Sequence, residues 1–225
     1  MGVYKSINHA FVRTLEMILR QMTIDGAKPV IGLTGAIGSG KSTVAGFLSA
    51  QKFGIVDCDK VSANILSTIS ASILAPIFGW NVVRPSGEID KKRIADMIFT
   101  DAAIYKKFMD LMISPIFHKM FSRCLDFYCD DKVRGIVVNA PLLVEYSHQF
   151  SFCDGWILVD CPLPLRLDRV VKNRGWKEEE LHRRERFMLP MVIKRSIVDY
   201  IVWNDGGMDK CEEQVKRFLE GWKQK

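Results

Sequence analysis

The chain has 225 residues, of which 48% are hydrophobic and 26% charged, with a formal net charge of +6. That length and composition fit a soluble globular protein with one sizeable core and room for a lid or a small insertion. The six cysteines are scattered and form no C-x-x-C pair. This pattern argues against a disulfide framework or a zinc site, and it favours reduced thiols in the cytoplasm.

Residues 1–28 form a separate N-terminal extension. Apolar residues recur at helical spacing between residues 8 and 22, which predicts an amphipathic helix that packs on the main domain. Arg13, Glu16 and Arg20 interrupt this run, so it fits neither a secretory signal nor a membrane span. The first six residues also match the short N-myristoylation pattern, but that pattern often occurs by chance, and we favour the packed helix.

Residues 29–225 are predicted to form a single domain in which short apolar strands alternate with helices. The predicted strands are residues 30–34, 53–57, 133–139, 156–160 and 198–203. The predicted helices are residues 41–52, 60–78, 91–127 with a break, 163–188 and 208–222. This alternation predicts an α/β fold in three layers, with a five-stranded parallel sheet and helices on both faces.

The first predicted strand runs directly into a phosphate-binding motif. The segment GAIGSGKS, residues 35–42, matches G-x-x-x-x-G-K-[ST] with a strand before it and a helix after it. Glycines allow backbone N–H groups to turn inward around a phosphate, and the following helix offers its positive end. The predicted ATP-binding residues of this loop are Gly35, Ala36, Ile37, Gly38, Ser39, Gly40, Lys41, Ser42 and Thr43. Lys41 is expected to neutralise phosphate oxygens, and the Ser42 hydroxyl is the expected Mg²⁺ ligand.

Other nucleotide-binding classes fit the rest of the chain less well. The D-x-x-G and N-K-x-D motifs of GTPases do not occur in the sequence, and motor or transporter ATPases usually need a larger chain. A small kinase needs an acceptor site opposite the phosphates and a basic lid, and the sequence offers candidates for both.

Two acidic residues follow the second predicted strand. Asp57 falls at the carboxyl end of that strand, where ligands bind in open α/β sheets. It is predicted to orient the acceptor hydroxyl and take its proton, or else to hold a Mg²⁺-bound water. Asp59 is either a substrate contact or a helix N-cap. Asp160, at the end of the fourth strand, is a weaker metal candidate that a helix-capping role explains equally well.

The predicted lid, about residues 165–195, is strongly basic. It holds ten Lys or Arg against five Asp or Glu, a net charge of +5. Such a charge suits a lid over a triphosphate, and Arg169 and Arg174 are the residues expected to contact phosphate oxygens or a base. A solvated charged face is the plainer alternative. A nucleic-acid patch is a rival interpretation, but no interleaved aromatic residues support it.

The sequence resembles the dephospho-coenzyme A kinase family from about residue 30 to residue 222. The segments that carry the resemblance are IGLTGAIGSGKSTVAGFL, VDCDKVSANIL, SGEIDKKRIADMIF, APLLVE, DRVVKNRG and VDYIVWNDG. Each of the later motifs is weak alone, but their order and spacing together are specific.

The resemblance implies transfer of the γ-phosphoryl group of ATP to the ribose 3′-hydroxyl of dephospho-coenzyme A, with Mg²⁺, in a P-loop kinase fold. It also implies that Asp57 is the acceptor-side base and that residues 60–127 form a helical substrate region. Implied roles on the nucleotide side fall to Lys41, Arg169, Arg174 and Asn204. Implied substrate contacts are Asp57, Asp59, Pro141, Leu142 and Glu145.

Five positions depart from the family pattern. Ala36 stands where a second loop glycine is usual, and Ala63 where Arg or His is common. Ser114 replaces a histidine, while Arg166 and Met188 replace two glutamines. The phosphate loop, Asp57, Glu145 and the lid arginines are retained, so these departures bear on how the acceptor is held.

Three functions therefore stay open on sequence alone. The first is the dephospho-coenzyme A kinase, and the second is a kinase of another small acceptor, such as a nucleoside monophosphate or a shikimate-like alcohol. The third is a non-catalytic nucleotide-binding relative, against which Lys41, Ser42 and Asp57 argue. The expected partner is a small molecule rather than a nucleic acid or a membrane, and the expected assembly is a monomer or small homo-oligomer.

Overall fold

The computed structural model describes residue 17 and residues 28–142, 145 and 152–222. The amphipathic helix predicted over residues 8–22 lies outside these ranges, apart from Met17. The description below concerns residues 28–142, 145 and 152–222.

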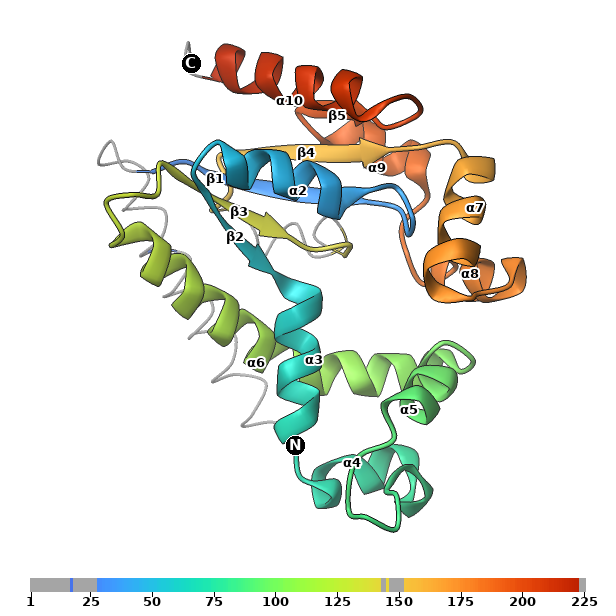
Figure 1. Ribbon diagram of the computed structural model, residues 1–225. Coiled ribbons are helices and arrows are strands. Elements are labelled where there is room, and N and C mark those ends of the chain that lie inside the picture. The colour runs from blue at the N-terminus through green and yellow to red at the C-terminus, as the bar shows by residue number, and fades with distance from the viewer. Residues whose placement is uncertain (1–16, 18–27, 143–144, 146–151, 223–225) are drawn as a thin grey trace.

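A five-stranded parallel sheet forms the centre of the domain (Figure 1). Its strands are β1 (Val30–Gly35), β2 (Phe53–Asp57), β3 (Gly135–Asn139), β4 (Gly155–Asp160) and β5 (Tyr200–Trp203), and their order across the sheet is β2-β3-β1-β4-β5. Every residue of β1 and β3 is buried, as expected of strands covered on both faces. The predicted α/β sheet is therefore confirmed. β3 and β5 are each two residues shorter at their starts than predicted.

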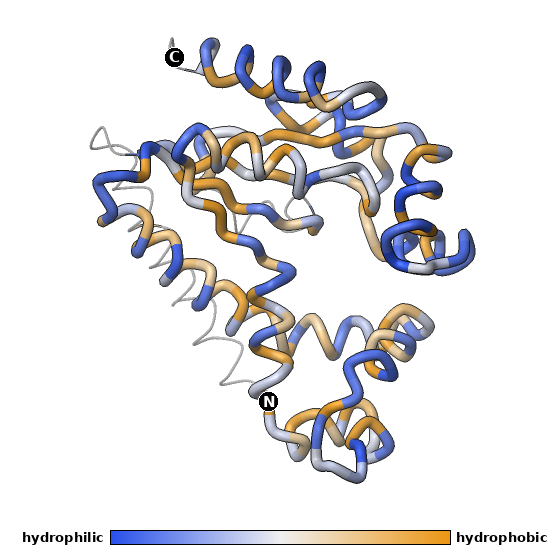
Figure 2. The backbone as a smooth tube through the Cα atoms, in the orientation of Figure 1, coloured by the Kyte–Doolittle hydropathy of each residue, from blue (hydrophilic) through white to orange (hydrophobic). Residues whose placement is uncertain are grey.

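Helices cover both faces of this sheet. Helices α2 (Lys41–Ala50) and α10 (Met208–Trp222) pack against one face in a core that includes Val44, Leu48 and Phe218. Helix α6 (Ala102–Tyr128) covers the other face with Phe117, Met120 and Phe121. Figure 2 shows that the strands are predominantly hydrophobic, whereas the outward turns of α10 are hydrophilic. These three layers agree with the prediction.

The helical region beyond β2 is divided more finely than predicted. The expected helix 60–78 is two helices, α3 (Cys58–Thr68) and α4 (Ala71–Phe78), bent by 102° at the break. Ile69 is extended there, and the Ser70 hydroxyl caps α4 by accepting from the N–H of Ser72. The predicted break in 91–127 separates α5 (Lys91–Ile98) from α6, and a short 3₁₀ turn, η1 (Trp80–Val82), precedes α5. A separate core with Leu74, Phe78 and Ile94 holds these pieces together.

The lid also contains more and shorter helices than predicted. The expected helix 163–188 is α7 (Leu163–Arg174) and α8 (Glu178–Glu185), and Gly175 ends α7 at φ +63°, in the left-handed region that glycine favours. Helix α9 (Met191–Ile197), which was not predicted, starts after Pro190. The lid helices and α5 lie on the same side of the molecule, beyond the carboxyl ends of the strands (Figure 1).

Among the described residues, no single helix is long and apolar enough to cross a membrane. The bent pair α3 and α4 passes that test of length and composition only when the two are taken together.

Candidate active site

The phosphate-binding motif forms the loop between β1 and α2. Gly38 and Gly40 have φ values of +76° and +94°, a backbone conformation that L side chains rarely adopt. At Gly38 a Cβ would also lie 2.9 Å from the carbonyl oxygen of Arg166, so the loop touches the backbone of α7. The glycine pattern is thus required both by the turn and by this close approach.

Lys41 begins α2 and its side chain lies across the loop. Its Nζ donates to the carbonyl oxygens of Gly35 at 2.9 Å and Ala36 at 3.0 Å. Burial lowers the pKa of Lys41 to about 8, an effect that the Asp59 carboxylate opposes and the Lys194 ammonium reinforces. A lysine in this state gains a proton readily when an anion arrives beside it.

A cavity of about 480 Å³ opens next to this loop, and we call it the nucleotide cavity. Its lining combines residues of the phosphate loop with predicted nucleotide-binding residues of α7 and of the segment after β5. The lining includes Gly38, Gly40, Lys41, Ser42, Thr43, Asp57, Asp59, Asn139, Arg169, Arg174 and Asn204. The fold therefore brings together residues that are more than 150 positions apart in the sequence.

Arg169 and Asn204 close one wall of the nucleotide cavity. The Arg169 guanidinium donates to the carbonyl oxygens of Ser39 at 3.2 Å and Asn204 at 3.2 Å. The Asn204 amide donates to the Ser39 carbonyl oxygen at 2.8 Å. These bonds fasten α7 and the segment after β5 to the phosphate loop.

A second cavity, of about 520 Å³, adjoins the first, and we call it the acceptor cavity. It lies between the lid and the helical region, and Lys41, Asp59 and Arg174 line both cavities. Pro141 and Leu142, two of the predicted substrate contacts, line the acceptor cavity.

Five aromatic side chains of the acceptor cavity were missed by the sequence analysis. They are Phe99, Tyr105, Phe108, Trp176 and Phe187. The rings of Tyr105 and Phe187 stack with centroids 4.5 Å apart. Because these residues lie on four separate segments, no local pattern in the sequence could have revealed them as a group.

The two aspartates after β2 occupy different positions. Asp57 is the N-cap of α3 and accepts a hydrogen bond of 3.1 Å from the N–H of Lys60. The capping role considered for Asp59 was therefore assigned to the wrong residue. Asp59 lines both cavities, whereas Asp57 lines only the nucleotide cavity. Desolvation in the cleft and the nearby Asp57 carboxylate raise the pKa of Asp59, while Lys41 and Arg174 oppose the shift.

Glu145 does not line either cavity. Its carboxylate forms an ion pair with the fully buried Lys194 at 2.8 Å and accepts from the N–H of Leu189 at 2.9 Å. Lys194 also donates to the carbonyl oxygen of Pro141 at 3.0 Å. In this structure Glu145 thus joins the segment after β3 to α9 instead of facing the acceptor cavity with Pro141 and Leu142.

Asp160 also has structural partners. Its two carboxylate oxygens accept from the N–H of Cys161 at 2.8 Å and from Nε of Arg195 at 2.6 Å. The residue preceding α7 is Pro162, which makes no side-chain cap, so the proposed capping by Asp160 does not occur in this helix.

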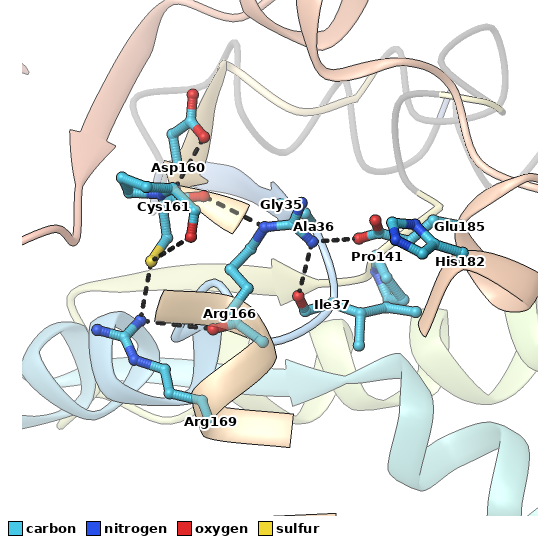
Figure 3. A network of polar contacts seen from close by, with 12 residues as sticks. Gly35, Ala36, Ile37, Pro141, Asp160, Cys161, Arg166, Arg169, His182 and Glu185 are labelled. Carbon is cyan, nitrogen blue, oxygen red and sulfur yellow. Dashed lines mark hydrogen bonds and ion pairs between the residues drawn. The ribbon is translucent and has the colours of Figure 1, made fainter. Parts of the chain in front are cut away.

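The residues that depart from the family pattern lie in varied places. Met188 lines the acceptor cavity. The Ala63 carbonyl accepts from Lys91 Nζ at 3.3 Å, and Ala36 is buried in the loop. Arg166 is buried at the start of the lid, where it contacts the phosphate loop (Figure 3).

Hard oxygen donors suited to Mg²⁺ line the nucleotide cavity. Ser42 and the two carboxylates of Asp57 and Asp59 are present together with Asn139, whose buried Oδ1 has no hydrogen-bond partner in the part of the chain that the structure describes. Among the described residues, no group of three His, Cys, Asp or Glu could hold a metal alone. Such a donor set fits a magnesium ion that takes further ligands from bound phosphates.

A phosphate loop on a parallel sheet, a basic lid and two adjoining cavities together define a P-loop phosphotransferase of the small-molecule kinase type. The dephospho-CoA kinase family model matches residues 29–210. Since this match covers most of the chain, the chain belongs to the dephospho-CoA kinase family.

Similar proteins occur in bacteria and in animals. A dephospho-CoA kinase of Carboxydothermus hydrogenoformans is 30% identical over 203 residues, which cover 88% of this chain and 96% of that protein. A dephospho-CoA kinase domain-containing protein of Danio rerio is 27% identical, over 84% of this chain and 83% of its own.

Solved structures agree with the fold. The protein TT1252 of Thermus thermophilus superimposes with a TM-score of 0.72 at 28% identity, over 87% of this chain and 98% of its own. A dephospho-CoA kinase of Campylobacter jejuni gives a TM-score of 0.54 at 19% identity, over 86% of this chain and 97% of its own, and supports the fold.

Proposed function

We propose that this chain transfers the γ-phosphoryl group of ATP to the ribose 3′-hydroxyl of dephospho-coenzyme A, which yields coenzyme A and ADP. The observation that carries the proposal is the pair of adjoining cavities, because Lys41 and Asp59 line both of them. Phosphoryl transfer needs the donor phosphate and the acceptor hydroxyl to meet in line, and two cavities that share a wall allow this. Family membership supplies the identity of the acceptor.

The phosphate loop holds the nucleotide in this proposal. Backbone N–H groups between Gly35 and Thr43 surround the phosphates, and Lys41 exchanges its two carbonyl partners for phosphate oxygens. Ser42 and Asp57 are the residues that would hold Mg²⁺, which when bound neutralises phosphate charge.

Asp59 is the better candidate for the acceptor-side base. The sequence predicted Asp57 for this role, but Asp57 caps α3 and lines only the nucleotide cavity. Asp59 lies where the cavities meet, and its raised pKa makes it a stronger base than an ordinary carboxylate. Asp57 then serves the metal, which was the alternative considered for it from the sequence.

The lid arginines act on the nucleotide side. Arg174 lines both cavities and is placed to contact the transferring phosphoryl group. Arg169 and Asn204 hold the segment after β5 beside the phosphate loop, where the resemblance places the adenine of ATP.

The acceptor is held in the second cavity by the helical region and the lid. An adenine ring is flat and apolar on its faces, so the aromatic cluster offers it stacking surfaces. Pro141 and Leu142 also line this cavity, and Glu145 is linked to Pro141 through Lys194.

The remaining expectations concern partners and place. We propose a cytoplasmic enzyme, monomeric or a small homo-oligomer, without a nucleic-acid partner. The lid cations support the last point, because Arg183 pairs with Asp96 of α5 at 3.0 Å and Arg184 pairs with Glu180 at 2.6 Å. These two arginines are paired within the molecule, which leaves fewer lid cations for a nucleic acid.

The proposal is tested by ADP release with purified full-length chain, MgATP and a panel of acceptors. We expect turnover with dephospho-coenzyme A and at least a hundredfold lower kcat/KM with adenosine monophosphate or shikimate, since the first lacks the phosphopantetheine part of the acceptor and the second also lacks its adenine ring. Equal turnover with another acceptor would assign the chain to a different small-molecule kinase. No turnover with any acceptor would favour a non-catalytic relative.

A further inference from the structure

Arg166 is a buried cation that touches three different segments (Figure 3). Its Nε donates to the carbonyl oxygen of Cys161 at 3.2 Å, and its Nη1 donates to the carbonyl oxygen of Ile37 at 3.1 Å. The same Nη1 forms an ion pair with the Glu185 carboxylate. One guanidinium therefore joins the start of α7, the phosphate loop and the end of α8.

The contact with the phosphate loop is close and reaches the substrate cavities. Ile37 lines the acceptor cavity, and the next residue, Gly38, touches the Arg166 backbone. A shift of the Arg166 guanidinium would therefore move the carbonyl of Ile37, a residue that lines the acceptor cavity.

The contact with α8 is made at Glu185, close in sequence to two residues that line the acceptor cavity. Arg184, directly before Glu185, and Phe187, two residues after it, both line that cavity. The Glu185 carboxylate is also close enough to Lys41 to raise the pKa of that lysine, although burial is the larger effect and lowers it. Glu185 is thus connected to the phosphate loop through Arg166, and its charge acts on Lys41.

We propose that Arg166 and Glu185 are positioning residues that couple the phosphate loop to lid helix α8, so that nucleotide binding orders the acceptor cavity. The inference rests on the proposed function for the identity of the acceptor, but its nucleotide part stands without it. The resemblance implies a neutral glutamine at position 166, which could not form an ion pair with Glu185.

Mutation can separate the contact of Arg166 with Glu185 of α8 from its contacts with the carbonyl oxygens of Ile37 and Cys161. Glu185→Gln removes the negative charge at the end of α8, but Arg166 can still donate to the carbonyl oxygens of Ile37 and Cys161. Arg166→Gln removes the guanidinium contacts with both the phosphate loop and α8, and it leaves the Glu185 carboxylate without this cation. The matched control is Glu178→Gln, the same substitution on the same helix, where the Glu178 carboxylate pairs with His182 at an exposed site.

The test is hydrogen–deuterium exchange of the full chain with and without MgATP, with no acceptor present. In the wild type and in Glu178→Gln, MgATP should slow exchange in peptides of the phosphate loop and in peptides covering residues 176–189. Glu185→Gln should keep the loop protection and lose the protection of α8. Arg166→Gln should lose the protection of α8 and bind ATP about tenfold more weakly, within the range of measured couplings between sites.

Steady-state kinetics give a second readout that a purely structural role would not move. Glu185→Gln should raise the KM for the acceptor about tenfold while kcat stays within about twofold, because only acceptor binding depends on the order of α8. This measurement does not depend on the folding of Arg166→Gln.

The outcomes separate this inference from the proposed function. If MgATP protects the loop but not α8 in the wild type, or if Glu185→Gln keeps the protection of α8, the coupling is contradicted and the proposed function stands. If MgATP protects neither region, the nucleotide site itself is wrong and both proposals fail. If the coupling holds but dephospho-coenzyme A is not phosphorylated, only the acceptor is wrong.

Discussion

At the scale of single residues, Lys41 links phosphate binding to protonation. Its pKa of about 8 follows from burial, and its ammonium rests on two carbonyl oxygens of the loop. A bound triphosphate places negative charge beside Lys41 and raises its pKa. Nucleotide binding near pH 8 must therefore be accompanied by proton uptake.

The first prediction concerns this proton. Because burial lowers the pKa of Lys41 to about 8, part of the Lys41 side chains are neutral at that pH in the free protein, so MgATP binding should take up a fraction of a proton and weaken as the pH rises further. Calorimetry in two buffers of different ionisation enthalpy measures the uptake. Lys41→Met should remove it, and a binding enthalpy independent of the buffer in the wild type would contradict the prediction.

The same shift has a consequence for stability. A lysine with a lowered pKa in the folded state binds fewer protons than in the unfolded state between pH 8 and its ordinary pKa. The contribution of Lys41 to the free energy of unfolding therefore rises with pH through this window, and below it the buried charge is a constant penalty.

The second prediction separates Asp57 from Asp59. Asp59→Asn should lower kcat by about a hundredfold or more, the usual size of a general-base effect, while the Kd for MgATP changes little. Asp57→Asn keeps a good N-cap residue, so it should fold normally and require a higher Mg²⁺ concentration for half-maximal activity.

Titration of activity with Mg²⁺ in both variants gives the answer. If Asp57→Asn loses kcat at saturating Mg²⁺ while Asp59→Asn does not, the base is Asp57, as the sequence alone predicted. The sequence identified both carboxylates and assigned the base to Asp57 from its place at the end of a strand, whereas the cavity that each carboxylate lines depends on the fold.

At the scale of elements, the lid is fastened to the helical region by stacked side chains. The Arg184 guanidinium lies between the Phe99 ring at 4.4 Å and the Trp176 ring at 4.3 Å. Arg183 adds an ion pair to Asp96 of α5. Arg184 and both of the rings that it contacts line the acceptor cavity.

The third prediction concerns the contact of Arg184 with these two rings. Arg184→Ala should raise the KM for the acceptor about tenfold, consistent with about 0.5–2 kcal/mol for a cation–π contact, and should leave the Kd for MgATP nearly unchanged. It should also raise ATP hydrolysis without acceptor, since a loosened lid admits water. Lys172→Ala, at an exposed site on α7, is the control and should match the wild type in both assays.

Activity with and without acceptor checks both effects. A normal acceptor KM in Arg184→Ala would show that the stacked arginine does not shape the acceptor cavity.

The sequence predicted the strands better than the helices for a physical reason. A strand buried on both faces is a continuous apolar run, as in VIGLT at residues 30–34, and that run is visible locally. The break between α3 and α4 depends instead on the separate core around Leu74, which is assembled from residues far apart in the chain. Gly175 and Pro190 did mark the ends of lid helices, but helix periodicity across residues 163–188 obscured the first signal.

At the scale of the whole molecule, one buried ion pair connects the acceptor side to the lid side. Lys194 of α9 pairs with Glu145 and bonds to Pro141, while Glu145 also holds the N–H of Leu189. The Lys194 side chain is 1% exposed. Removal of one partner would leave the other charge buried and uncompensated.

The fourth prediction is a large effect on stability at this pair. Lys194→Met should lower the free energy of unfolding by about 3–5 kcal/mol, and the double variant Lys194→Met with Glu145→Gln should recover part of the loss. Chemical denaturation monitored by tryptophan fluorescence measures both. A loss below about 1 kcal/mol in Lys194→Met would place the pair among weak surface contacts.

The outcome also bears on Glu145, which the sequence predicted as a substrate contact. If the double variant is stable and keeps the wild-type KM for the acceptor, Glu145 acts only through the fold. A selective rise in that KM would support direct contact in the bound state.

The central claim is that the two adjoining cavities bring the γ-phosphate of ATP to one hydroxyl of one acceptor. The most direct measurement is phosphorus NMR and mass spectrometry of the products after incubation of the full chain with MgATP and dephospho-coenzyme A. The account predicts one new phosphomonoester on the ribose 3′-oxygen for each ADP formed. ADP accompanied by free phosphate, or a phosphoryl group on any other atom of the acceptor, would contradict it.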